Sequence, residues 1–205
     1  MSVITSIKPQ RNNKRLNIYL DGKFGFGIDM ENFVKLGLKV EQELGEKEVE
    51  EIIKKAEFQK TLDKLLRFAT VRPRSEKEVK DWLKRKKVHE SMHRQLFNRL
   101  NRLKLIDDRQ FALWWISQRQ EFKPKGKRVL DFELRAKGVA REVIQEVLGE
   151  VVIDEEKIAR QLLEKKAYRF KGLPRREARQ KMSQFLARKG LGWEVIEKAV
   201  MKVLK

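Results

Sequence analysis

The sequence predicts a mainly α-helical protein: an elongated array of three tandem three-helix repeats, preceded by a small N-terminal segment that contains a β-meander. Three observations predict this fold. Apolar residues alternate with other residues over the first 30 positions, and they keep a helical period from Gly45 onward. A stretch of about 50 residues then recurs three times, a length typical of helical repeats that stack on their neighbours.

The first 30 residues read as three short strands. Asp21-Gly22, between the second and third apolar runs, is a strong hairpin signal, and Asn12-Asn13 is a weaker one between the first and second. These signals predict a three-stranded meander. Residues 29–43 should add a short helix that ends near Gly37 and an extended piece, Leu38-Lys39-Val40.

The repeats share an apolar pair in the second helix of each unit. The pairs are Val79 and Leu83, Leu130 and Leu134, and Met182 and Leu186. The second members of successive pairs are separated by 51 and 52 residues. We expect four segments, which are residues 1–57 (strands with short helices) and three-helix repeats over 58–106, 107–153 and 154–205.

Helix ends are marked in each repeat. Ser75, with Glu78 three residues later, predicts a capping box, and Asp107 and Asp154 are predicted N-caps. The turn after the second helix carries Gly138 in repeat two and Gly190 in repeat three, which suits a left-handed C-cap. Lys87 stands at that place in repeat one, so this helix should need a different cap.

The charge of the chain predicts an acidic partner. The sequence has 49 Lys and Arg against 30 Asp and Glu, a formal charge of +19. Residues 1–57 hold ten of each sign, so the whole excess lies in the repeats. A nucleic acid or a nucleoprotein is the leading class of partner, and a merely solvated basic surface is the alternative.

Several functional classes find no support in the sequence. The chain has no Cys, and no apolar run is long enough to span a bilayer, so we expect a soluble, cytoplasmic protein that is a monomer and has no membrane partner. His89 and His93 lie four apart without a third ligand, which favours either an exposed pair or a helix cap and a half-buried side chain over a metal site. We expect no cofactor and no active site.

Basic residues recur in register at both ends of the second helices. Those at the starts oppose the helix dipole, and this placement predicts a partner; those at the ends partly complement it. Stacked repeats would align both groups as one stripe. The starts carry Arg72, Arg74, Lys123, Lys125, Lys127, Arg128, Arg175 and Arg176, and the ends carry Lys84, Arg85, Lys86, Lys87, Arg135, Lys137, Arg188 and Lys189.

Aromatic residues give a second test, because proteins that bind single strands combine basic residues with stacking rings. Most aromatic residues of the repeats follow the apolar helix stripes and should lie in the core. These are Trp82, Phe111, Trp115, Phe132, Phe185 and Trp193. Trp114 lies off the stripe, so we expect it to be exposed and available for binding.

The repeats also resemble a known family. The segments Arg72-Pro-Arg-Ser-Glu-Lys-Glu-Val, Leu105-Ile-Asp-Asp-Arg-Gln-Phe-Ala, Pro124-Lys-Gly-Lys-Arg-Val-Leu and Glu133-Leu-Arg-Ala-Lys-Gly-Val resemble, in order, motifs of the RecX family of RecA regulators. The resemblance spans residues 58–204 and implies an elongated helical array. It also implies binding along the groove of the RecA filament and inhibition of the recombinase. Trp114 and two additional residues between Pro174 and Leu186 depart from the family pattern.

Residues and resemblance together predict a non-enzymatic regulator that lies along the RecA–DNA filament, with weaker electrostatic binding to single- and double-stranded DNA. Two alternatives remain open. One is a helical array that binds nucleic acid on its own. The other is a structural scaffold with a basic surface.

Overall fold

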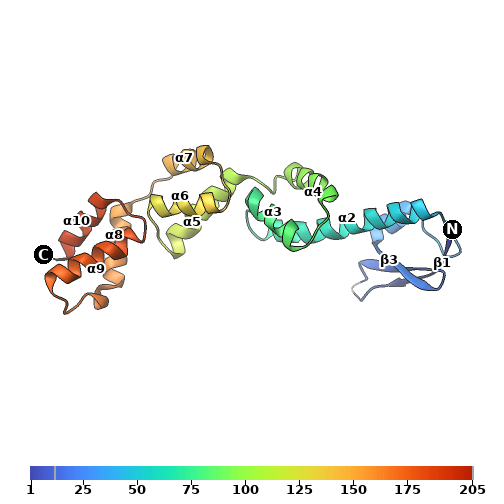
Figure 1. Ribbon diagram of the computed structural model, residues 1–205, viewed down its shortest axis with the longest axis horizontal. Coiled ribbons are helices and arrows are strands. Elements are labelled where there is room, and N and C mark those ends of the chain that lie inside the picture. The colour runs from blue at the N-terminus through green and yellow to red at the C-terminus, as the bar shows by residue number, and fades with distance from the viewer. Residues whose placement is uncertain (12, 205) are drawn as a thin grey trace. The chain divides into compact units, whose positions relative to one another are not determined.

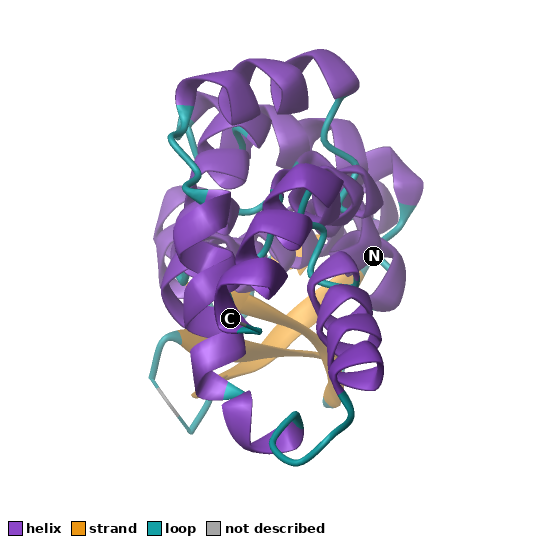
Figure 2. Cartoon of the chain, turned by 90° about the vertical axis from the view of Figure 1, so that its left-hand side faces the viewer, coloured by secondary structure: helices purple, strands orange, loops and turns teal. Residues whose placement is uncertain are grey.

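The computed structural model describes residues 1–11 and 13–204. Over these residues the chain forms ten α-helices and four β-strands, and the strands gather in one sheet (Figures 1 and 2). The predicted mainly α fold with an N-terminal sheet is confirmed. None of the described helices is both long enough and apolar enough to cross a membrane.

The chain forms two compact units. The first contains Met1–Val71 and Val88–Leu100, and the second contains Arg72–Lys87 and Asn101–Lys205. The division into four segments stays a prediction.

The N-terminal sheet is antiparallel, with strand order β3-β2-β1-β4. Its strands are β1 (Ser2–Pro9), β2 (Arg15–Leu20), β3 (Lys23–Asp29) and β4 (Glu43–Leu44). The predicted meander is therefore present, with a fourth strand beside β1 that the sequence reading missed.

Residues 38–40, which were predicted to be extended, form no strand, and the fourth strand lies at Glu43–Leu44. A turn in which Lys39 N–H donates to Gln42 Oε1 reverses the chain, with Glu41 at a φ of 69°. Strand pairing therefore begins at Glu43.

The hairpin at Asp21-Gly22 is confirmed. Both residues have positive φ, 49° and 80°, as a two-residue turn of the I′ type requires. The weaker turn signal, Asn12-Asn13, includes Asn12, which lies outside the described residues.

Two helices follow the meander in the first unit. Helix α1 (Met30–Leu36) begins at Asp29, whose Oδ1 accepts from Asn32 N–H at 2.9 Å, and it ends at Gly37 with a φ of 59°, as predicted. Helix α2 (Glu46–Thr70) is 25 residues long and continues through the boundary expected between residues 57 and 58. Buried Ile52 and Ala56 of α2 share a core with the sheet.

Helices α3 (Glu76–Arg85) and α4 (Glu90–Arg102) come next. Helix α3 belongs to the second unit and most of α4 to the first. His89 is the exposed cap of α4, since its Nδ1 lies 3.3 Å from the N–H of Ser91. His93 is half-buried, and its Nε2 lies 2.9 Å from the carbonyl oxygen of Val88. Of the two arrangements that the sequence left open, the structure has the cap with a half-buried side chain and not the exposed pair.

Two three-helix bundles make up the rest of the second unit. The first consists of α5 (Asp108–Phe122), α6 (Lys127–Ala136) and α7 (Arg141–Glu150). The second consists of α8 (Glu155–Lys165), the 3-10 helix η1 (Ala167–Arg169), α9 (Arg175–Ala187) and α10 (Trp193–Val203). Each bundle has its own core, and the apolar pairs that defined the repeats are buried.

The helix caps repeat between the bundles. Asp107 and Asp154 cap α5 and α8, as predicted. Gly138 and Gly190 have φ of 82° and 83° and end their helices in the left-handed conformation. Lys87 has a φ of 52°, so the expectation of a different cap in repeat one was wrong. This helix ends in the same conformation at a cost of about 1 kcal/mol, which a residue with a Cβ incurs there.

Candidate functional site at the repeat junctions

The start of α3 is joined to the following repeat by hydrogen bonds, and we call this contact the first junction. Ser75 is fully buried and caps α3: its Oγ accepts from Glu78 N–H at 3.2 Å and donates to the carbonyl oxygen of Lys137 at 2.8 Å. The N–H of Glu76 donates to Oδ1 of Asp108 at 2.9 Å. One cap residue therefore orders its own helix and also binds the next repeat.

The second junction, between α6 and the last repeat, has the same plan. Gly126 is the N-cap of α6, as Ser75 is the N-cap of α3. Its N–H donates to the carbonyl oxygen of Lys189 at 2.9 Å. The N–H of Lys127 donates to Oε1 of Glu155 at 2.8 Å. A Cβ on Gly126 would lie 2.3 Å from the carbonyl oxygen of Gly190, so here the two backbones meet without side chains between them.

The carboxylate of Glu78 is the shared ion-pair partner of three cations at the first junction. Its Oε1 lies 2.8 Å from Nζ of Lys137 and accepts from Nη2 of Arg72 at 2.9 Å. Its Oε2 lies 2.8 Å from Nη1 of Arg72 and 3.9 Å from Arg74. Burial by itself would raise the pKa of Glu78, but the hydrogen bonds from Arg72 and Lys137 lower it below its ordinary value. Burial lowers the pKa of the Arg74 guanidinium.

This network corrects two expectations. Ser75 is the N-cap that the sequence predicted, but Glu78 binds cations, and the capping box is therefore only half formed. The inference that cations at the start of this helix have no partner within the fold was also wrong. Glu78, in the first turn of α3, is that partner for Arg72 and Arg74.

Two tryptophans extend this network. The guanidinium of Arg72 lies 4.9 Å from the ring centroid of Trp114. Trp114 is half-buried against the core of its bundle, so the expectation that it is exposed was wrong. Trp115 Nε1 donates to Oε2 of Glu133 at 2.9 Å, and Arg119 binds the same oxygen at 2.6 Å.

The other aromatic residues divide between the core and the surface. Trp82 and Phe111 are buried as expected, and Phe185 is partly buried. Phe132 and Trp193 are 72% and 63% exposed, so placing them in the core was wrong. In both, the side chain lies off the buried stripe of its helix, which α6 builds from Leu130 and Leu134.

The predicted basic residues fall into two groups. Four have a carboxylate within 4.0 Å: Arg72, Arg74 and Lys137 near Glu78, and Arg135 near Asp131. The rest have no carboxylate within that distance among residues 1–11 and 13–204. These are Lys84, Arg85, Lys86, Lys87, Lys123, Lys125, Lys127, Arg128, Arg175, Arg176, Arg188 and Lys189. These twelve are the predicted site residues whose charge no carboxylate of the described chain pairs with.

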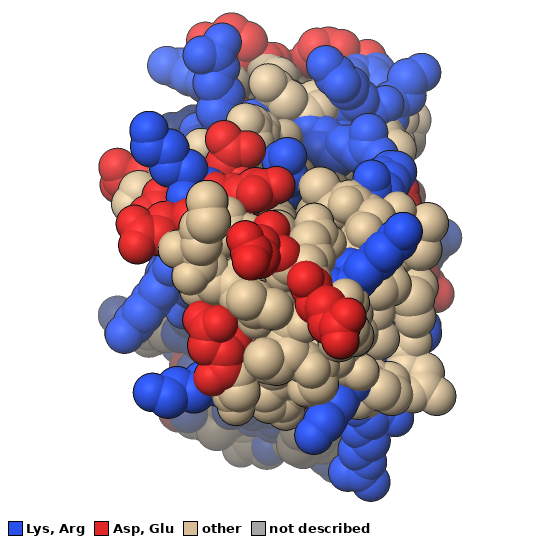
Figure 3. Space-filling view, turned by 90° about the vertical axis from the view of Figure 1, so that its right-hand side faces the viewer, with Lys and Arg blue, Asp and Glu red and all other residues tan. Residues whose placement is uncertain are grey.

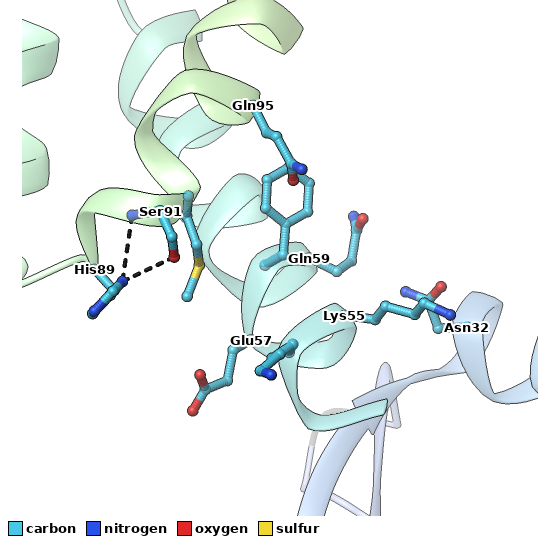
Figure 4. Close-up of a pocket in the computed structure, with 10 residues that line it drawn as sticks. Asn32, Lys55, Glu57, Gln59, His89, Ser91 and Gln95 are labelled. Atoms are coloured by element: carbon cyan, nitrogen blue, oxygen red, sulfur yellow. Dashed lines mark hydrogen bonds between the residues drawn. The ribbon is translucent and has the colours of Figure 1, made fainter. Parts of the chain in front are cut away.

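The first unit offers a different kind of surface. Figure 3 shows acidic and basic side chains interspersed, in keeping with the balanced charge of residues 1–57. A cleft of about 670 Å³ lies between α2 and α4, with Lys55, Glu57 and Gln59 on one side and His89 and Gln95 on the other (Figure 4). Within the described residues, no group of three His, Asp or Glu side chains could hold a metal ion.

Three family models match parts of this chain. Residues 2–45 match the family model of the regulatory protein RecX N-terminal domain. Residues 107–148 and 154–200 match the second and third three-helix domains of RecX. Regulatory protein RecX of Bacillus licheniformis is 36% identical over 204 residues, which cover 98% of this chain and 78% of that protein. The chain belongs to the RecX family.

Other RecX proteins are similar to this chain in sequence or in structure. Regulatory protein RecX of Bacillus subtilis is 35% identical over 205 residues and is covered to 78% of its length. A crystal structure of regulatory protein RecX superimposes with a TM-score of 0.70 at 27% identity, covering 96% of this chain and 98% of that one. RecX from Lactobacillus salivarius has the same fold, with a TM-score of 0.61 at 24% identity over 71% of this chain.

Sequence reasoning missed the acidic members of the junctions. Glu78 was assigned only to a cap, and Glu133 and Asp108 were given no role at the site. The available signal was position: Glu78 is the third residue of its helix, next to a cap and two basic residues that oppose the helix dipole. A basic cluster at a helix start therefore calls for a search for an acidic residue in the first turn.

Proposed function

We propose that this RecX protein is a non-enzymatic regulator that binds the RecA–DNA nucleoprotein filament along its groove and inhibits RecA ATPase activity, filament growth and strand exchange. Membership in a family of regulatory proteins supports the regulatory role. The observation that carries the filament as partner is the set of cations without carboxylate neighbours, all of which belong to the second unit. A polyanion along several repeats would neutralise them together.

A direct test measures RecA ATPase and strand exchange on single-stranded DNA while this protein is titrated to stoichiometric coverage of the filament. We expect both activities to fall. Unchanged activities at full coverage would contradict the proposal.

Charge-reversed variants test whether the cations carry the binding. Lys86→Glu, Arg128→Glu and Arg175→Glu combined should weaken filament binding by about tenfold or more, because each side chain is exposed and none has a carboxylate within reach in the described residues. The matched control reverses Lys35, Lys54 and Lys47 in the first unit and should leave binding unchanged. Equal loss in both variants would show that only net charge matters.

The alternative function, a basic array that binds nucleic acid alone, predicts a different order of affinities. Filament binding should exceed binding to bare DNA of the same length if the proposal holds. Equal affinities for bare DNA and filament would favour the alternative.

A further inference from the structure

The two junctions share a backbone plan but differ in charge. Glu78 is the third residue of α3, and Val129 is the third residue of α6. Glu133 stands one residue before buried Leu134, and Phe185 stands one residue before buried Leu186. The second junction therefore has apolar residues at both positions where the first has a carboxylate.

The cations of the first junction nevertheless have counterparts at the second. Lys123 and Lys125 precede the cap Gly126 as Arg72 and Arg74 precede Ser75, and Lys189 precedes Gly190 as Lys137 precedes Gly138. Lys166 follows the cap Asp154 by twelve residues, as Arg119 follows Asp107. We call these four residues, Lys123, Lys125, Lys166 and Lys189, the lysine cluster.

The lysine cluster gathers at one backbone contact and has no carboxylate partner. The N–H of Gly126, the residue after Lys125, donates to the carbonyl oxygen of Lys189 at 2.9 Å. Nζ of Lys189 lies 5.6 Å from the ring centroid of Phe185, which carries no charge. Burial lowers the pKa of the Lys189 ammonium, and the nearby charges of Lys125, Lys166 and Lys123 lower it further. Lys125, Lys166 and Lys189 are half-buried. No carboxylate of the described chain lies within 4.0 Å of any of the four.

Glu155, the acidic residue that meets the start of α6 at this junction, is already engaged. Oε1 of Glu155 accepts from Lys127 N–H at 2.8 Å, and its Oε2 lies 3.3 Å from the N–H of Gly192. Its charge stabilises the backbone of the junction, and it does not pair with the lysine cluster. Four positive charges held together in this way favour an external anion, since partly desolvated cations are costly without one.

Exposed aromatic rings beside the lysine cluster indicate which anion. Phe122 precedes Lys123 and is 67% exposed, and Tyr168 is 69% exposed. Nζ of Lys166 lies 5.6 Å from the ring centroid of Tyr168. Proteins that bind single-stranded nucleic acid combine cations for the phosphates with rings on which bases stack. A carboxylate-rich protein surface would gain little from these rings.

We propose that the lysine cluster binds the phosphodiester backbone of single-stranded nucleic acid, with Phe122 and Tyr168 as stacking surfaces for its bases. At the first junction each corresponding cation lies within 4.0 Å of Glu78 or Glu133, so we expect that junction to contribute less to binding. This inference rests on the proposed function in one respect: it assigns DNA contact to the second junction within the filament. The binding itself requires no RecA.

The test measures binding of the full chain to a fluorescent oligo-dT at increasing salt without RecA. Lys125→Gln with Lys189→Gln should lower affinity by about tenfold or more and make the log–log salt slope shallower by about 1.4, since each lost phosphate contact removes about 0.7. Lys35→Gln with Lys54→Gln is the matched control, since each of these lysines pairs with a glutamate four residues away. It should behave as the wild type.

Val129→Glu supplies a second variant that retains all four lysines. It places a carboxylate where Glu78 stands in the first junction, so binding to oligo-dT should weaken and the salt slope should become shallower. On the unaltered chain, bound oligo-dT should protect Lys125, Lys166 and Lys189 from acetylation, as read by mass spectrometry. This measurement does not depend on whether any variant folds.

Three results would overturn the inference. They are absence of oligo-dT binding by the unaltered chain at low salt, unchanged acetylation of these lysines in the complex, and equal protection by polyglutamate and oligo-dT. Failure here with intact RecA inhibition would leave the proposed function standing. Oligo-dT binding without any effect on RecA would do the reverse.

Discussion

The carboxylate of Glu78 lies 2.8 Å from the ammonium of Lys137, 59 residues further along the chain, and this pair joins one helical repeat to the next. The Glu78 side chain is only 12% exposed and also binds Arg72. A buried carboxylate that holds several cations has a large effect when removed, because the cations are left without a counter-charge.

Glu78→Gln should therefore lower the free energy of unfolding by about 3 kcal/mol at neutral pH. Glu76→Gln is the matched control: it lies in the same helical turn, its side chain is 51% exposed, and its pair with Lys80 is worth under about 0.5 kcal/mol. Urea titration followed by circular dichroism measures both. Equal effects for the two variants would contradict the role assigned to Glu78.

The same carboxylate should make stability depend on pH. Because the pKa of Glu78 is lowered in the folded protein, its contribution is present above its ordinary value of 4.5 and is lost as pH falls through the lower folded value. The difference in melting temperature between wild type and Glu78→Gln should shrink as pH falls from 7 toward 3. Asp108, whose pKa burial raises, acts with the opposite sign and is common to both proteins. A constant difference across this range would refute the linkage.

Gly126→Ala should destabilise the second junction. The added methyl group would lie 2.3 Å from the carbonyl oxygen of Gly190, and neither backbone can move without breaking the hydrogen bond between Gly126 and Lys189. A loss of about 2 kcal/mol is expected, as for overpacked sites. Gly149→Ala in α7 is the control, because nothing lies within 4 Å of its added methyl group, and it should stabilise the helix by about 0.5 to 1 kcal/mol. Thermal melts that rank the two variants in the opposite order would disprove the close contact.

Arg72→Lys should not be a conservative change. The planar guanidinium donates to Oε1 of Glu78, lies 2.8 Å from its Oε2 and lies 4.9 Å from the ring centroid of Trp114, and an ammonium cannot reproduce these contacts together. We expect a loss of about 1 kcal/mol in unfolding free energy. Arg85→Lys, at the exposed end of α3, should change it by less than about 0.5 kcal/mol. If the two variants are indistinguishable in urea titrations, the guanidinium geometry at Arg72 is unimportant.

The sequence predicted those features of the fold that depend on local residue patterns. The period of apolar residues located the second helices through Leu83, Leu134 and Leu186, all fully buried, and glycines marked where two of those helices end. The apolar stripe of the helix wrongly predicted that Trp193 is buried, because the burial of a residue at a helix start depends on which elements pack against it. Pairing between Glu78 and Lys137 joins residues 59 positions apart, and no local pattern reports such a contact.

The site could be predicted only as a set of cations. The repeat register identified sixteen basic residues but could not tell paired from unpaired ones. Arg74 and Lys125 occupy equivalent positions in their repeats, yet Arg74 is 11% exposed beside Glu78, and Lys125 has no carboxylate nearby in the described chain. What separates them is the third residue of the adjoining helix, a glutamate in one repeat and a valine in the next. Lys166 was missed because it ends a first helix, away from the segments that repeat most clearly.

The close approach of Gly126 to Gly190 has a consequence for cooperativity. In a linear array, stability is the sum of what each repeat contributes and how strongly it is coupled to its neighbour. The coupling at the first junction includes the ionised Glu78 and the cations around it, whereas the second junction has, besides the carboxylate of Glu155, a main-chain hydrogen bond from Gly126 to Lys189 that does not titrate. In acid the array should therefore unfold in two steps, with residues 72–87 released first and the last two bundles melting together.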